Sequence, residues 1–101
     1  MRPLLLVSLL ACTAQPARFR PEWAAHWQSG CQSYYVERSG IEQANLFCEC
    51  MVAGGSGRFT ERQWAAQTAM LDHTGHAAEA YLGIAHYCAD ITNDWFSQFG
   101  P

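Results

Sequence analysis

Four cysteines, at positions 31, 48, 50 and 88, limit the folds that are open to this chain of 101 residues. A chain of this length forms one domain with a small core, in which each disulfide adds on the order of 2 to 4 kcal/mol of stability. An even number of such cysteines in a short exported chain favours two disulfides. The competing interpretation is a four-thiolate zinc site, but the paired C-x2-C motifs typical of such sites are missing.

The N-terminus carries the features of an export signal. Arg2 is followed by an apolar run from Leu4 to Leu10 and then by small residues. A helix that spans a bilayer needs roughly 20 apolar residues, so this run is too short to be a membrane span. We therefore expect an exported chain.

The end of this signal, Leu9-Leu10-Ala11-Cys12, resembles the lipobox of a bacterial lipoprotein precursor. The resemblance implies a signal peptide over residues 1–11, cleavage before Cys12 and lipidation of that cysteine. Several acyl chains on one residue make a stable membrane anchor. In such lipoproteins an aspartate after the cysteine often marks inner-membrane retention, and Thr13 at this position favours the outer membrane.

The alternative is an ordinary secretory signal that is cut after Ala14 and leaves a soluble periplasmic protein beginning at Gln15. Residues 13–21 contain two prolines and show no periodicity, which predicts that residues 12–21 of the lipoprotein form an extended, lipid-anchored tether. The folded domain is then expected over residues 22–101.

Composition excludes one class of partner. Six arginines and no lysine stand against nine acidic residues, and the net charge is −3. A chain with this balance lacks the basic surface that neutralises phosphates, so nucleic acid is not an expected partner. Half of the residues are hydrophobic, which predicts a folded chain.

The pattern of apolar residues predicts an all-α fold, a small disulfide-linked bundle of about four helices. Pro21 begins the first helix, which runs to about residue 37, and capping boxes at Ser39–Glu42 and Thr60–Gln63 begin the second and third. The fourth follows Thr74-Gly75. Each helix has an apolar stripe, and the expected stripe residues include Trp23, Trp27, Cys31 and Tyr34 in the first; Ile41, Ala44, Cys48, Met51 and Val52 in the second; and Ala77, Tyr81, Ile84, Cys88, Ile91 and Trp95 in the fourth.

These helices favour one of the two feasible disulfide pairings. Cys31 and Cys48 lie at similar distances from the turn at Ser39-Gly40, so an antiparallel hairpin brings them together. Cys50 lies about 200° around the helix from Cys48, toward Cys88. A small rotation of the helices would instead pair Cys31 with Cys50, and this alternative stays open.

One polar cluster has the chemistry of metal ligands: Asp72, His73, His76 and Glu79. Together they could supply nitrogen and oxygen ligands to a divalent transition metal. Thr74-Gly75 is expected to break the helix within the cluster, which would separate the ligands. We therefore expect no metal and no cofactor, and keep a small metal-binding protein or enzyme at this cluster as the alternative function. His26, His86 and Asp90 are expected to be solvated or packed residues.

The aromatic residues point to a binding function. Thirteen per cent of the chain is aromatic, more than a small four-helix core easily encloses. Tyr35, Trp95, Phe96 and Phe99 are the rings expected at the surface, where aromatic side chains are common in protein interfaces. The alternative is that the three C-terminal rings fold back onto the bundle. No nucleophile with a neighbouring base is recognisable, so we expect a non-enzymatic envelope lipoprotein that binds another envelope protein, as an assembly factor, inhibitor or immunity-type partner does.

Overall fold

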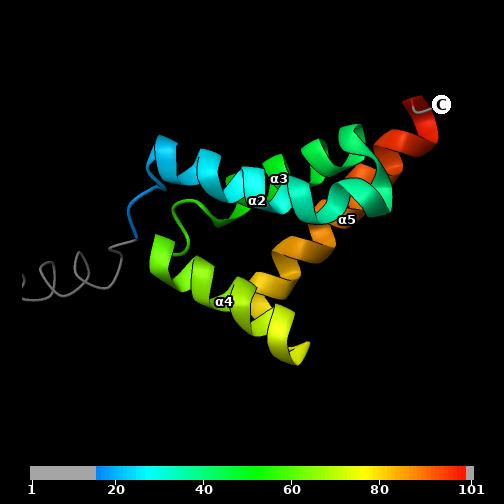
Figure 1. Cartoon of the computed structure of the whole chain (residues 1–101). Coiled ribbons are helices and arrows are strands. Elements are labelled where there is room, and N and C mark those ends of the chain that lie inside the picture. Colours follow the sequence, from blue (N-terminus) through cyan, green and yellow to red (C-terminus); the bar gives the residue numbers. More distant parts are fainter. Residues whose placement is uncertain (1–15, 100–101) are drawn as a thin grey trace, which may run out of the picture.

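The computed structural model describes residues 16–99, which form four helices (Figure 1). The helices are α2 (Pro21–Ser39), α3 (Ile41–Gly55), α4 (Glu61–Thr74) and α5 (Glu79–Phe99). The all-α fold expected from the sequence is confirmed. In the described part of the chain no helix is long and apolar enough to cross a membrane.

Both predicted disulfides are present. Cys31 on α2 is bonded to Cys48 on α3, and Cys50 on α3 is bonded to Cys88 on α5, with Cα atoms 5.9 and 5.6 Å apart. The favoured pairing is therefore confirmed. Because α3 carries one cysteine of each bridge, it is cross-linked to α2 and to α5, whereas no disulfide joins α4 to another helix.

The boundaries of α4 follow the predicted signals. Thr60 accepts a hydrogen bond from the backbone N–H of Gln63, and the Gln63 side chain accepts one from the Thr60 N–H, which completes the capping box. Phe59, before the cap, packs against Trp64 with ring centroids 5.4 Å apart. The helix ends at Gly75, whose φ of 78° is left-handed and suits glycine.

The capping box expected at Ser39 is wrong. Ser39 is the last residue of α2, and its hydroxyl donates to the Tyr35 carbonyl one turn earlier. The chain reverses at Gly40, whose φ of 85° is a conformation that glycine adopts without strain but other residues do not. No side chain caps the beginning of α3. The helix therefore runs past the expected end and leaves its serine inside the last turn.

Trp64 joins α4 to the rest of the domain. Its side chain is fully buried, and its ring centroid lies 4.5 Å from that of Tyr81 and 5.6 Å from that of Trp27. Phe19, which precedes α2, packs on the same indole at 5.9 Å. One side chain of α4 thus touches α2, α5 and the N-terminal segment.

The folded part of the chain includes residues that were expected in the tether. Phe19 is buried, and its backbone N–H donates to the Ser56 hydroxyl. Arg20 donates to the Glu61 carboxylate from both its backbone and its guanidinium, which holds the start of α2 against the start of α4. This pair lowers the pKa of the Glu61 carboxyl. The domain therefore begins by residue 19 and not at 22.

The predicted apolar stripes agree with the buried residues in the middle of the helices but not at the helix ends. Tyr81, Ile84 and Cys88 are buried in α5, but Ile91 and Trp95 are about two-fifths exposed. Ile41, at the turn between α2 and α3, is 56% exposed. Figure 1 shows the C-terminal half of α5 extending away from α4 toward one end of the molecule, where fewer neighbouring helices are present to cover its apolar face.

Candidate binding pocket

A pocket of about 340 Å³ lies between α2, α3, α4 and the beginning of α5. It exists because α4 is attached near its own beginning, through Trp64. From there α4 diverges from α2 toward its C-terminal end (Figure 1). The volume falls within the range of roughly 300 to 1,000 Å³ found for small-ligand sites.

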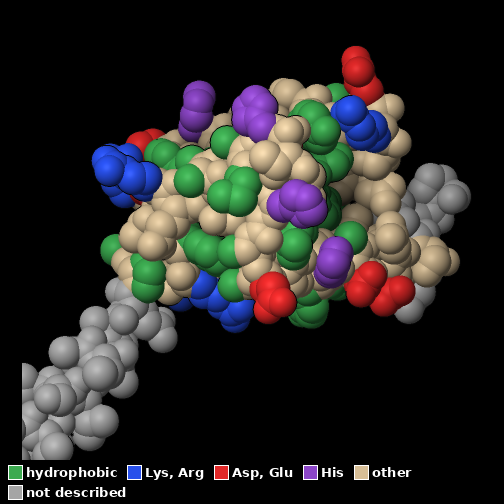
Figure 2. Space-filling view, turned by 90° about the horizontal axis from the view of Figure 1, so that it is seen from below, with side chains coloured by type: hydrophobic (Ala, Val, Ile, Leu, Met, Phe, Trp, Pro, Cys, Tyr) green, Lys and Arg blue, Asp and Glu red, His purple; other side chains and the backbone are tan. Residues whose placement is uncertain are grey.

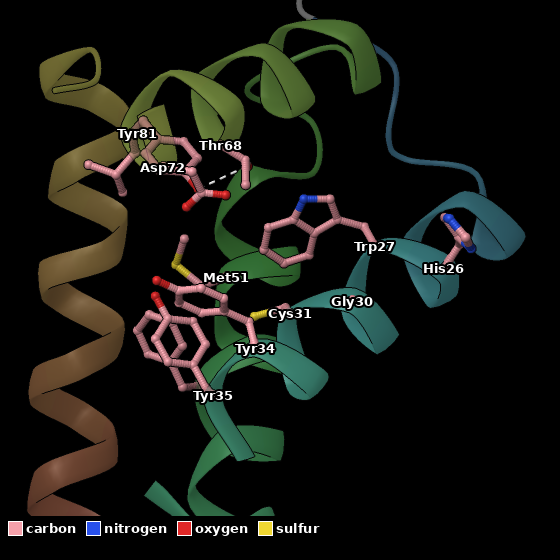
Figure 3. Close-up of a pocket in the computed structure, with 12 residues that line it drawn as sticks. His26, Trp27, Gly30, Cys31, Tyr34, Tyr35, Met51, Thr68, Asp72 and Tyr81 are labelled. Carbon is pink, nitrogen blue, oxygen red and sulfur yellow. Dashed lines mark hydrogen bonds between the residues drawn. The ribbon is translucent and has the colours of Figure 1, made fainter. Parts of the chain in front are cut away.

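Five of the residues that line the pocket are aromatic. Figure 3 shows Thr68, Asp72 and Tyr81 on one side, Tyr34 and Tyr35 on the other, and Met51 between them. The aromatic residues that line it are Trp27, Tyr34, Tyr35, Phe47 and Tyr81, and Leu71 and Met51 add aliphatic surface. The site therefore offers ring faces and apolar side chains to a ligand.

Contacts between side chains fix this wall. Tyr35 packs edge-on against Phe47 and against Tyr34, with ring centroids 5.0 and 4.9 Å apart. On the opposite side, the hydroxyls of Thr68 and Tyr81 are 3.0 Å apart and share a hydrogen bond. Because each ring is held by a neighbour, little side-chain entropy remains to be lost when a ligand enters.

The pKa values of two tyrosine hydroxyls at the pocket, those of the half-buried Tyr35 and the buried Tyr81, are raised. Burial raises the pKa of Tyr35, and Tyr34 and Asp72 raise it further against the opposite effect of Arg38. Burial is also the main cause of the raised pKa of Tyr81, to which Asp72 adds while the Thr68 hydrogen bond opposes it. Both hydroxyls therefore stay neutral, chiefly because of burial.

We expected the Tyr35 ring at the surface, but the structure places it differently. Its side chain is half-buried and faces the pocket, whereas Tyr34, expected in the buried stripe, is 50% exposed. Adjacent helix positions differ by about 100°, so the stripe of Trp27 and Cys31 could continue to either tyrosine. The Phe47 ring on α3 contacts Tyr35 and so fixes the inward position.

The other predicted binding residues lie apart from this pocket. Trp95 is 41% exposed and lines a separate shallow hollow with Leu46 and Ile91. The backbone of α5 extends through Phe96 and Phe99, but these two side chains lie outside the described part of the structure, as do the signal peptide and Cys12. Tyr35 and Trp95 therefore line two different hollows.

The alternative metal cluster does not form. Asp72 and His73 lie at the end of α4, Gly75 breaks the helix, and Glu79 begins α5. Within residues 16–99 no three His, Cys, Asp or Glu side chains are placed to hold a metal ion. Figure 2 shows histidine side chains spread over one face and not gathered at one point. The helix break that was expected at Thr74-Gly75 separates the four residues, and Asp72 belongs to the pocket instead.

Several pocket residues were recognised in the sequence only as core. Trp27, Met51 and Tyr81 were placed in apolar stripes, and they do face inward, but the stripes do not reveal that the helices leave a space between them. Phe47 and Leu71 stood out in no pattern. Apolar periodicity identifies which side of a helix is inward, while a pocket depends on how the helices diverge.

Comparisons with models of protein families, with curated proteins and with solved structures gave no match to this chain. The pocket itself is therefore the basis for a function.

Proposed function

We propose that this protein is a non-enzymatic binding module of the bacterial cell envelope, and that its aromatic pocket receives a side chain of a partner protein. The observation that carries the proposal is the pocket of about 340 Å³ walled by five aromatic residues. Aromatic rings and methionine are enriched where proteins bind one another, and buried rings supply much of the binding energy.

The disulfides support the envelope as the location. Disulfides persist in oxidising compartments such as the bacterial periplasm and are rare in the cytosol. The lipobox-like Leu9-Leu10-Ala11-Cys12 adds a membrane anchor to this proposal. Cys12 and Phe19 are seven positions apart, so a lipid on Cys12 holds the domain within about 25 Å of the bilayer. The partner is then a protein of the membrane surface, with the outer membrane favoured.

The binding proposal is tested by capture from envelope extracts with two matched tyrosine variants. Tyr35→Ala removes a pocket ring, whereas Tyr87→Ala removes a ring that is 66% exposed and lies outside this pocket. We expect the wild type and Tyr87→Ala to retain a stoichiometric partner, and Tyr35→Ala to capture at least tenfold less of it while its circular dichroism shows that it is still folded at the temperature of the assay. Equal capture by the two variants would refute the pocket as the binding site.

The location is tested by the intact mass of the mature protein. We expect a chain that begins at Cys12 and carries the added mass of a diacylglycerol and an acyl chain. A chain that begins at Gln15 without lipid would remove the anchor and place the binding module in the soluble periplasm, where the capture experiment still applies.

A further inference from the structure

We infer that the side chain received by the pocket is basic, a lysine or arginine of the partner protein, with its charge at Asp72 and its aliphatic stem against the aromatic wall. This inference rests on the proposed function and specifies its ligand. Three features of the pocket lead to it: the ring faces, the position of Asp72 and the charges that surround the site.

The ring faces suit a cation. The π-electrons of Trp and Tyr attract an ammonium or guanidinium group placed over the ring, with a free energy of about 0.5 to 1 kcal/mol at exposed sites and more where water is excluded. One such contact is already present on the rim, since the Arg38 guanidinium lies 4.3 Å from the centre of the Tyr34 ring. Arg38 also donates a hydrogen bond to the Tyr34 carbonyl on the same helix. It is not among the residues that line the pocket.

Asp72 supplies the opposite charge at the edge of the pocket. It lies across the opening from Tyr34 and Tyr35 (Figure 3), and among the described residues it is the one acidic side chain that lines the site. It forms no ion pair within residues 16–99. Asp72 is itself exposed, so its attraction for a cation is that of a surface carboxylate and weakens with added salt.

The surroundings of the pocket disfavour an anion. Burial is the main cause of the raised pKa of both Tyr35 and Tyr81, and the negative charge of Asp72 adds a smaller effect in the same direction. No lysine or arginine lines the pocket, and His26 lies at its outer edge, away from Asp72 (Figure 3). The net charge of −3 adds a long-range attraction for a basic partner.

The shape of the pocket favours one long side chain. Lysine and arginine combine an apolar stem with a charged head, and they bury the stem along apolar surface while the head stays near water. Here the stem would lie over Met51 and Trp27, and the head would reach the exposed Asp72. A purely aliphatic side chain would fill the same space but leave Asp72 without a partner.

Three probes of equal length test the charge: hexylammonium, hexanol and hexanoate, titrated into the oxidised protein while NMR signals of the pocket rings are followed. We expect hexylammonium to bind about 3- to 10-fold more tightly than hexanol, and hexanoate to bind most weakly. Asp72→Asn should lower the affinity for hexylammonium by about 2- to 5-fold, which leaves the part contributed by the rings, and should not change the affinity for hexanol. Asp90→Asn, an exposed carboxylate outside the pocket, is the control that should change neither.

The outcomes separate this inference from the proposed function. Hexanol that binds as tightly as hexylammonium, or an Asp72→Asn variant that binds hexylammonium as tightly as the wild type, would overturn the basic ligand and leave the binding module standing. No shift of the pocket signals by any probe would overturn the pocket and both proposals with it. Saturating hexylammonium should also release the captured partner, and a partner that stays bound would overturn the assignment of its basic side chain to this pocket.

Discussion

Replacing both Cys50 and Cys88 with alanine should lower the free energy of unfolding by about 4 kcal/mol, compared with about 3 kcal/mol for the same change at Cys31 and Cys48. The bridges close segments with sequence separations of 38 and 17 residues. A longer closed loop removes more freedom from the unfolded chain, and these values follow from that entropy. Urea unfolding monitored by circular dichroism measures both.

The two pairs are well matched for this comparison. Each contains one fully buried cysteine, Cys48 or Cys88, and one half-buried cysteine, Cys31 or Cys50. Alanine leaves a similar loss of packing in both cases and places no hydroxyl in the core. A larger loss at Cys31 and Cys48 would contradict the dependence on loop length and indicate that local packing decides.

Loss of the two bridges should also affect the fold differently. α2 and α3 are adjacent in sequence and are joined through Gly40, so their hairpin persists without its bridge. α5 reaches α3 only after α4 and two turns, and the Cys50–Cys88 bond is the covalent link that closes this path. A domain with a stability of about 5 to 15 kcal/mol loses a large part of it with this bond.

The disulfide pairing could be predicted because it depends on local geometry. Cys31 and Cys48 stand nine and eight positions from Gly40, and an antiparallel hairpin makes such positions neighbours. The rotation of about 200° from Cys48 to Cys50 then favours Cys88 as the partner of Cys50, although the sequence left the pairing of Cys31 with Cys50 open. Helix type, helix order and one capping box follow from signals of the same short range.

The pocket could not be predicted because it depends on the angle between α2 and α4. Its residues come from four helices, and the sequence separation from Trp27 to Tyr81 spans most of the domain. The apolar stripes assigned Trp27, Met51 and Tyr81 to a closed core, since stripe analysis assumes that facing stripes meet along their full length. They meet at Trp64 and diverge beyond it, which leaves Asp72 beside an open aromatic wall.

The largest single effect is expected from Trp64→Ala, which should lower the free energy of unfolding by about 3 to 5 kcal/mol. The indole is fully buried and contacts the rings of Phe19, Trp27 and Tyr81, among others. Truncation leaves a cavity at the point where α4 joins the domain. Because no disulfide reaches α4, this helix should loosen while α2, α3 and α5 stay cross-linked.

Hydrogen exchange measured for each helix separately tests whether α4 loosens more than the other helices. Amide protection in α4 should fall by several orders of magnitude more than protection around Cys48 in α3, and hexylammonium binding should be lost because Thr68 and Asp72 lie on α4.

Gly55→Ala provides a second test of the contact between Trp64 and the rest of the domain, since its new Cβ would lie 2.7 Å from the Trp64 ring. Gly83→Ala is the matched control, because a Cβ there meets nothing within 4 Å.

We expect Gly55→Ala to destabilise the protein by about 1 to 3 kcal/mol through this overlap, and Gly83→Ala to stabilise it by about 0.5 to 1 kcal/mol, as alanine does inside an open helix. The opposite signs follow from the position of one indole ring. Uniform loss of protection in all four helices of Trp64→Ala, or equal stability of the two glycine variants, would show that α4 is held to the domain by contacts other than Trp64.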